Sequence, residues 1–193
     1  SRLSMFAGYI TINISSPNTE GLRDFHDQGE LKKLLSGLNK IIKEKKIECP
    51  IAIKISPDVK DDEISKIVDL VSSHNIKGIV VSNTTDSNRD NLSDIKKHEV
   101  GGLSGQPLKD ISTNLIKRFY KETKGKIKII GVGGVDSGQS AFEKITAGAD
   151  AVQLYTGMVY KGPGIVKEIK KDLVSILKKE KIKNISEAVG INA

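Results

Sequence analysis

The chain has 193 residues, 37% of them hydrophobic and 28% charged, which is typical of a globular domain large enough to bury a core. A net charge of +7 invites a nucleic-acid partner, but the lysines are interleaved with acids and aromatics make up only 4%, so we expect none. One cysteine excludes an internal disulfide, three histidines show no metal-ligand spacing, and no run approaches the ~18 apolar residues of a membrane span.

Short β-branched runs alternate with longer amphipathic segments along the chain. In chain order, the pattern predicts a strand at 9–14, a helix at 30–45, a strand at 50–55, a helix at 61–73, a strand at 78–83, a polar segment at 84–106, a helix at 110–123, a strand at 127–132, a helix at 137–147, a strand at 151–155, a helix at 165–179 and a helical turn at 185–190. Asp61 or Asp62 is the expected cap of the second helix.

This alternation, with nearly continuous apolar strands, predicts a parallel sheet covered by helices. No G-x-G-x-x-G turn opens the first helix, so the pattern favours a (β/α)8 barrel over a dinucleotide-binding fold. Five strands are too few to close such a barrel. We therefore expect an α/β protein whose single domain, residues 1–193, is a partial TIM barrel of about five C-terminal βα units, with the first strands missing and lying upstream.

Polar residues and glycines follow every predicted strand. Catalytic groups of such barrels lie at the C-terminal ends of the strands, so five polar tips together predict one common site, although each alone is also typical of a turn. The tips are residues 13–19, Lys54 with 56–58, 82–85, 131–134 and 155–157.

Lys54 interrupts an apolar strand between Ile53 and Ile55, and strand alternation places it on the opposite face from both. We expect it in the barrel interior, because an outward lysine would meet the helix layer. An interior cation needs a negative partner, which is either a ligand group or Asp58.

Glycines form the loop 131–134 before a predicted helix, and the turn 155–157 ends the next strand. Glycine backbone and helix N-termini suit anions, and the loops after the last two strands of such barrels commonly hold phosphate. These loops predict a phosphorylated ligand, with simple tight turns as the alternative. Three amides at strand ends, Asn13, Asn18 and Asn83, can donate to and accept from a planar ligand such as a pyrimidine.

The segment Asn13-Ile-Ser-Ser-Pro-Asn-Thr-Glu-Gly-Leu-Arg23 closely resembles the signature of class 2 dihydroorotate dehydrogenases. The resemblance continues in the family's order through residues 54–58, 82–85, 101–108, 131–134 and 153–156. It implies oxidation of (S)-dihydroorotate to orotate in de novo pyrimidine (UMP) synthesis, with FMN taking the hydride and a quinone receiving the electrons.

The resemblance also implies residue roles. Ser16, where class 1 enzymes carry a cysteine, is expected to be the base that removes the C5 proton; a serine is a poor base, so a relay through a threonine or water would have to assist it. The implied substrate ligands are Asn13, Asn18, Asn83 and Thr84, and the implied FMN contacts are Asn13, Lys54, Ser82, Gly105, Gly134, Tyr155 and Thr156. No metal is implied.

The same resemblance implies peripheral membrane contact through an N-terminal segment upstream, at the inner face of the bacterial cytoplasmic membrane or at the mitochondrial inner membrane. Because the barrel edge is open, we expect these residues alone to bind FMN weakly and to turn over poorly. Two alternatives stay open. One is another phosphate-binding barrel enzyme, with or without a flavin, and the other is a non-catalytic half-barrel fragment.

Overall fold

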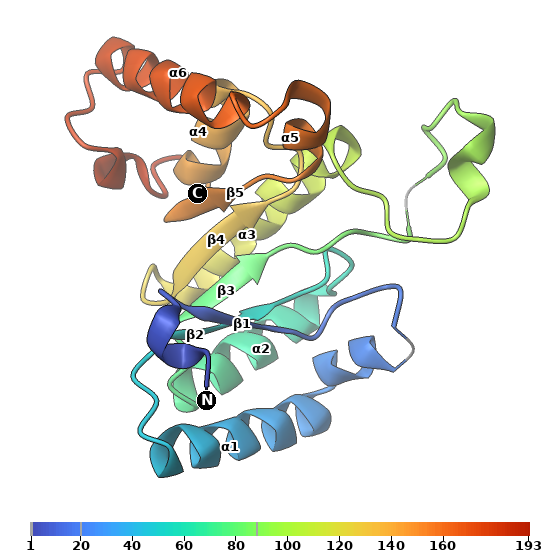
Figure 1. Ribbon diagram of the computed structural model, residues 1–193, viewed down its shortest axis with the longest axis vertical. Coiled ribbons are helices and arrows are strands. Elements are labelled where there is room, and N and C mark those ends of the chain that lie inside the picture. Colours follow the sequence, from blue (N-terminus) through green and yellow to red (C-terminus); the bar gives the residue numbers. More distant parts are fainter. Residues whose placement is uncertain (1, 20, 88) are drawn as a thin grey trace.

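The structure, a computed structural model, describes residues 2–19, 21–87 and 89–193, so Glu20 of the signature segment lies outside the described residues. In the described part the centre is a five-stranded parallel sheet whose strands lie side by side in chain order (Figure 1). A doubly wound sheet would reverse its strand order, whereas the wall of a TIM barrel keeps it. The fold is therefore part of a TIM barrel, as predicted. The strands are β1 (Ile10–Asn13), β2 (Ile51–Lys54), β3 (Gly78–Val81), β4 (Lys128–Val132) and β5 (Ala151–Gln153).

Helices follow the strands and cover one side of the sheet (Figure 1). Helix α1 contacts α2, α2 contacts α3, α3 contacts α4, and α4 contacts α6, so the helix layer runs in the same order as the strands. The helices are α1 (Gln28–Glu44), α2 (Asp61–Ser73), α3 (Lys109–Thr123), α4 (Gly138–Thr146), α5 (Thr156–Lys161) and α6 (Ile165–Lys179), and 3-10 turns lie at Ser4–Phe6, Leu22–His26, Ile95–His98, Gln106–Leu108 and Ile185–Ala188.

The two faces of the sheet differ in polarity. Ile53, Ile79 and Ile129 are paired in register and fully buried in the core that the helices share. Side chains alternate along a strand, so the neighbouring row, which includes Asn13 and Lys54, faces the opposite, concave side. Lys54 thus lies on the face opposite Ile53, as predicted.

The observed elements match the predicted ones closely, and α2 and α6 begin and end at the predicted residues. The predicted cap of α2 was wrong. Lys60 occupies the cap position, and its backbone N–H donates to the Glu63 carboxylate at 2.8 Å, while Asp61 and Asp62 lie within the first turn. Acids at three successive positions make the start of a helix ambiguous in a sequence.

Helix α5 was not predicted. It begins at Thr156, directly after the predicted strand 151–155, where the sequence predicted only the turn 155–157. Six residues are too few for a helical period to show.

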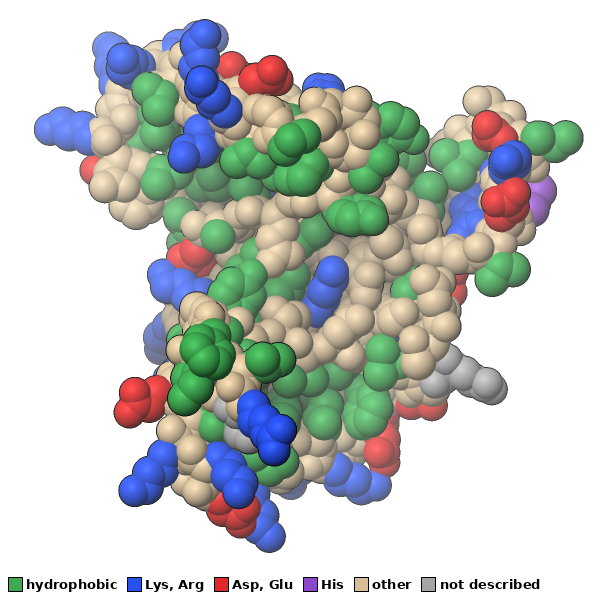
Figure 2. Space-filling model, viewed as in Figure 1, with side chains coloured by type: hydrophobic (Ala, Val, Ile, Leu, Met, Phe, Trp, Pro, Cys, Tyr) green, Lys and Arg blue, Asp and Glu red, His purple; other side chains and the backbone are tan. Residues whose placement is uncertain are grey.

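The distribution of charge on the surface follows the helices. On the face seen in Figure 2, lysines and arginines gather along α6 and near α1, and the centre over the strands holds few charged side chains. Among the described residues, no helix combines the length and the apolar character needed to cross a bilayer.

Candidate active site

A cavity of about 470 Å³ lies at the C-terminal ends of β2, β3, β4 and β5. This volume falls within the ~300–1,000 Å³ usual for small-molecule and cofactor sites. Lys54 at the end of β2 and the loops after β3, β4 and β5 therefore converge on one hollow, whereas the fifth predicted tip, residues 13–19 at the end of β1, does not line it. Its lining includes these predicted site residues: Lys54, Ser82, Asn83, Thr84, Gly105, Gly134, Tyr155 and Thr156.

Lys54 reaches the cavity from the last position of β2 and is half-buried. Within the described part of the chain, its ammonium has no hydrogen bond or ion pair, and burial lowers its pKa below the ordinary value. Asp58 does not pair with it, because that carboxylate accepts from Arg23 at 3.2 Å and from the Thr85 hydroxyl at 2.6 Å. The cavity thus contains a cation without a protein counter-charge.

A cluster of amides and hydroxyls joins the ends of β1 and β3. The Asn83 Nδ2 donates to Asn13 Oδ1 at 3.1 Å and to the buried Ser15 hydroxyl at 3.1 Å. The Asn83 Oδ1 accepts from the Thr84 backbone N–H at 2.8 Å. Asn13 does not line the cavity itself but fixes Asn83, which does. Ser15 was missed from the sequence, although it lies two residues after Asn13 and hence on the same side.

Bare glycine backbone forms the opposite wall. Gly105, Gly133 and Gly134 have φ values of 81°, 112° and 69°, which side chains with a Cβ rarely adopt. A Cβ on Gly134 would lie 2.6 Å from the Lys109 Cβ, and one on Gly105 would lie 3.0 Å from the Thr156 Cγ2. The glycines serve tight turns, and they also bring unobstructed backbone to the cavity.

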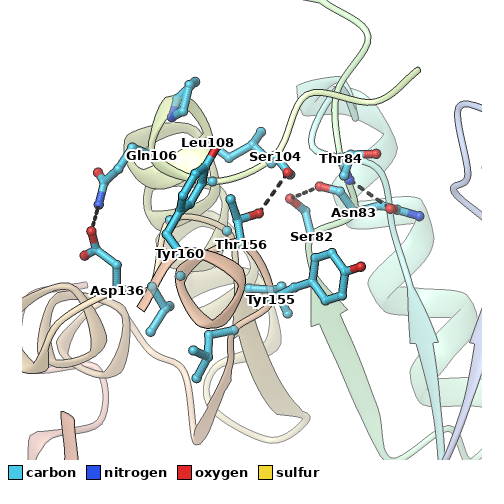
Figure 3. Close-up of a pocket in the computed structure, with 18 of the residues that line it drawn as sticks. Ser82, Asn83, Thr84, Ser104, Gln106, Leu108, Asp136, Tyr155, Thr156 and Tyr160 are labelled. Carbon is cyan, nitrogen blue, oxygen red and sulfur yellow. Dashed lines mark hydrogen bonds between the residues drawn. The ribbon is translucent and has the colours of Figure 1, made fainter. Parts of the chain in front are cut away.

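Several lining residues were not foreseen. Figure 3 shows that the Ser104 and Thr156 hydroxyls face each other, 2.8 Å apart, and that Gln106 Nε2 donates to Asp136 Oδ2 at 2.6 Å. The Lys161 ammonium donates to the Asp136 carbonyl at 3.0 Å. These contacts join the polar segment 84–106 to the loops after β4 and β5. The segment Gly101-Gly-Leu-Ser-Gly-Gln106, which belongs to the family resemblance, was the available signal for Ser104 and Gln106.

Ser16 and Asn18 do not line this cavity. The Ser16 hydroxyl accepts from the Asn18 backbone N–H at 3.2 Å, and Asn18 lines a separate hollow of about 330 Å³ between the loop after β1 and residues 97–101. The two hollows are close, because Thr84, which lines the first, and Pro17, which lines the second, both lie beside the Cα of Gly102. Arg23 fixes the β1 loop by pairing with Asp58 at 3.2 Å and with Asp86 at 2.8 Å.

No cluster of three histidine, cysteine or acidic side chains suited to a metal ion occurs among the described residues. The arrangement consists of the unpaired Lys54, the Asp136 and Lys161 side chains, amides, hydroxyls and glycine backbone around a cavity, with a serine on an adjoining loop. Such a set can bind an anionic, planar and hydrogen-bonding ligand.

Comparisons with known proteins identify the family to which the chain belongs. The family model described as dihydroorotate dehydrogenase matches residues 1–177. The quinone dihydroorotate dehydrogenase of Trichodesmium erythraeum is 44% identical over 191 residues, covering 95% of this chain and 50% of that protein. The mitochondrial quinone enzyme of Mus musculus is 40% identical, covering 98% of this chain and 49% of that protein.

Among solved structures, a crystal structure of the Eimeria tenella enzyme in complex with ferulenol matches with a TM-score of 0.95 and 35% identity. It covers 99% of this chain and 55% of that one. The chain thus spans about half the length of the curated relatives it matches. With the family model matched over residues 1–177, the chain belongs to the dihydroorotate dehydrogenase family, on the class 2 branch whose members are named quinone enzymes.

Proposed function

We propose that the protein oxidises (S)-dihydroorotate to orotate, with FMN as the hydride acceptor and a quinone as the final electron acceptor. The observation that carries the proposal is the convergence of Lys54, the Asn83-Thr84 pair and the glycine loops on one cavity. In this reaction, C5 of the substrate loses a proton, C6 loses a hydride, and two electrons pass on to the quinone. Bound FMN would supply the hydride-accepting ring.

The residues present suit FMN at both of its ends. The unpaired Lys54 ammonium and Ser82 would hold the electron-rich edge of the ring, because a half-buried cation without a protein counter-charge favours negative charge beside it. Gly105, Gly134 and Thr156, with Tyr155 beside them, would hold the phosphate end. Backbone without side chains allows close approach of an anion there.

The amide cluster suits the substrate. Asn13 and Asn83 are already joined by a hydrogen bond, so their orientations are fixed before a ligand arrives. Together with Thr84 and, from the neighbouring loop, Asn18, they offer donors and acceptors in the pattern that a pyrimidine dione with a carboxylate requires. Ser16, on that same loop, would remove the C5 proton.

The direct test is anaerobic mixing of the FMN-loaded intact protein with dihydroorotate. The visible flavin absorbance should bleach with formation of orotate, and a quinone analogue should restore the absorbance. Dihydrouracil, which lacks the carboxylate, is the matched control and should bleach it far less. Absence of visible flavin absorbance would favour a non-flavin barrel, and bleaching only by another reductant would favour a different flavin enzyme.

A Lys54→Met substitution should weaken binding of both FMN and riboflavin by about tenfold, because each contains the ring that we place against this ammonium. Burial lowers the pKa of Lys54, so the wild-type affinity should fall as pH rises, beginning below the ordinary lysine range. Flavin fluorescence titration measures both effects. The control is Lys66→Met, which removes an α2 surface lysine paired with Asp62. Unchanged affinity for both flavins would contradict this role for Lys54.

Localisation follows from the proposed acceptor. Quinones partition into bilayers, so we propose that the protein is membrane-associated through peripheral contact made by a segment upstream of these residues. The relatives of Mus musculus and of Arabidopsis thaliana are named mitochondrial, which fits the mitochondrial inner membrane, whereas the name of the Trichodesmium erythraeum relative gives no compartment.

A further inference from the structure

Lys144, on α4, is the fully buried charged residue of the described chain, with no exposed surface. Its ammonium donates to the Ser112 hydroxyl at 2.5 Å, to the Thr113 hydroxyl at 3.1 Å and to the Lys109 carbonyl at 3.3 Å. All three acceptors belong to the first two turns of α3, and all are neutral. A buried ammonium is thus solvated by hydroxyl and carbonyl oxygens without a carboxylate.

The nearest acids do not neutralise this charge by contact. On α4, the Glu143 carboxylate is taken by the Lys109 ammonium at 2.8 Å and by Gln139 at 3.1 Å. The Glu143 carboxylate and, on α3, the Lys109 ammonium and the Asp110 carboxylate act on the Lys144 charge only through space. Desolvation by burial therefore dominates and lowers the pKa of Lys144 to about 8. A buried charge without a counter-charge lowers the stability of the folded protein unless another interaction offsets this cost.

Lys144 lies directly behind the cavity wall that Gly133 and Gly134 form. A Cβ on Gly131 would lie 3.3 Å from the Lys144 Cδ, so the lysine chain covers the end of β4. The Ser112 hydroxyl, which accepts from Lys144, has the Gly133 carbonyl within 3.3 Å and the Lys109 carbonyl within 3.2 Å as acceptors for its single proton. Lys144 and Gly133 are thus linked through one hydroxyl.

This link gives the lysine two effects on the cavity wall. By donating to Ser112, the ammonium directs that hydroxyl to act as a donor and polarises its bond, which strengthens the hold on the Gly133 peptide. By its charge, in a region of low dielectric, it favours an anion on the far side of the loop. Neither effect depends on contact between Lys144 and the ligand.

We infer that Lys144 is a positioning residue for the phosphate end of the cofactor, acting through Ser112 and Gly133 and through its buried charge. The inference rests on the proposed function, because it assigns the phosphate end of FMN to this loop. The chemistry recognised is a phosphate monoester dianion, so riboflavin, which lacks the phosphate, is the matched probe.

The test compares dissociation constants of FMN and riboflavin for the intact apoprotein, measured by flavin fluorescence at pH 7. Lys144→Met fills similar volume without the charge and should weaken FMN about tenfold or more while riboflavin changes less than twofold. Ser112→Ala cuts the link and keeps the charge, and should give a smaller loss of the same selectivity. Lys109→Met, which removes a charge from the same α3–α4 contact but on its partly exposed side, is the control and should show little selectivity.

A second arm follows pH from 7 to 10. As pH rises through about 8, Lys144 loses its proton, so FMN should weaken relative to riboflavin in the wild type and not in Lys144→Met. Lys54 is expected to act on both flavins equally and cancels in the ratio.

The outcomes distinguish failure of the role of Lys144 from failure of the proposed function. If wild type binds both flavins and Lys144→Met weakens both equally or neither, the role of Lys144 is overturned and the proposed function stands. If wild type binds neither flavin, the proposed function is overturned and the inference with it.

Discussion

Ser16→Ala is expected to slow the reduction of bound flavin by dihydroorotate by about 100- to 10,000-fold, the usual loss on removal of a general base. FMN affinity should hardly change, because Ser16 does not line the cavity that we assign to the cofactor. Stopped-flow absorbance under anaerobic conditions measures the rate, and a flavin titration measures the affinity. An unchanged reduction rate would remove Ser16 from the mechanism.

The surroundings of Ser16 sharpen this prediction. Its hydroxyl accepts from the Asn18 backbone N–H, a contact that favours negative charge on the oxygen. A serine base must still lose its own proton, so the wild-type rate should rise with pH. Ser16→Cys is the informative companion variant, because class 1 enzymes carry a cysteine there. A thiol ionises near pH 8.5, so this variant should recover part of the rate, with its pH profile shifted toward neutrality.

The fold was largely predictable because its determinants are local. Alternation along β2 placed Lys54 on the face opposite Ile53, and apolar spacing gave the bounds of α2 and α6. The convergence of strand tips followed from parallel pairing alone. Helix α5 was not predicted because its six residues form fewer than two turns, too few for a helical periodicity to be recognised.

Parts of the site depended on contacts distant in sequence and were not predictable. Arg23 joins Asp58 and Asp86 across 35 and 63 residues, and this double pairing sets where the Ser16 loop lies. No pattern near Ser16 indicates that its loop adjoins the cavity instead of lining it. Lys144 is similar, since a lysine in an amphipathic helix is expected in solvent. It is buried because α4 packs against both α3 and α6.

Lys144→Met is expected to stabilise the apoprotein at pH 7 by about 1–2 kcal/mol. The folded pKa of about 8 lies below the unfolded value of 10.5, so the buried charge costs up to about 3 kcal/mol below pH 8. Loss of hydrogen bonds to Ser112 and Thr113 offsets part of the gain. Between pH 8 and 10.5 the unfolded chain binds more protons than the folded one, so wild-type stability should rise with pH. The difference between variant and wild type should shrink accordingly.

Urea unfolding of both apoproteins at pH 7 and pH 10 measures this difference. Lys109→Met is the matched control, because pairing with Glu143 raises the pKa of Lys109 above 10.5, so its contribution is present at both pH 7 and pH 10. That partly exposed pair should be worth less than about 1 kcal/mol, and with the opposite sign. A Lys144→Met protein less stable than wild type at pH 7 would identify Lys144 as a structural residue.

Measuring both the stability and the FMN affinity of Lys144→Met distinguishes a functional role of Lys144 from a structural one. Removal of a structural lysine would lower both the stability and the FMN affinity. Removal of a lysine retained for an anionic ligand should instead raise the stability of the apoprotein and lower its FMN affinity. Because ligand binding adds stability in proportion to the logarithm of affinity, a tenfold weaker variant gains about 1.4 kcal/mol less from excess FMN. Saturating FMN should therefore cancel most of the advantage of Lys144→Met at pH 7, and saturating riboflavin should leave it intact.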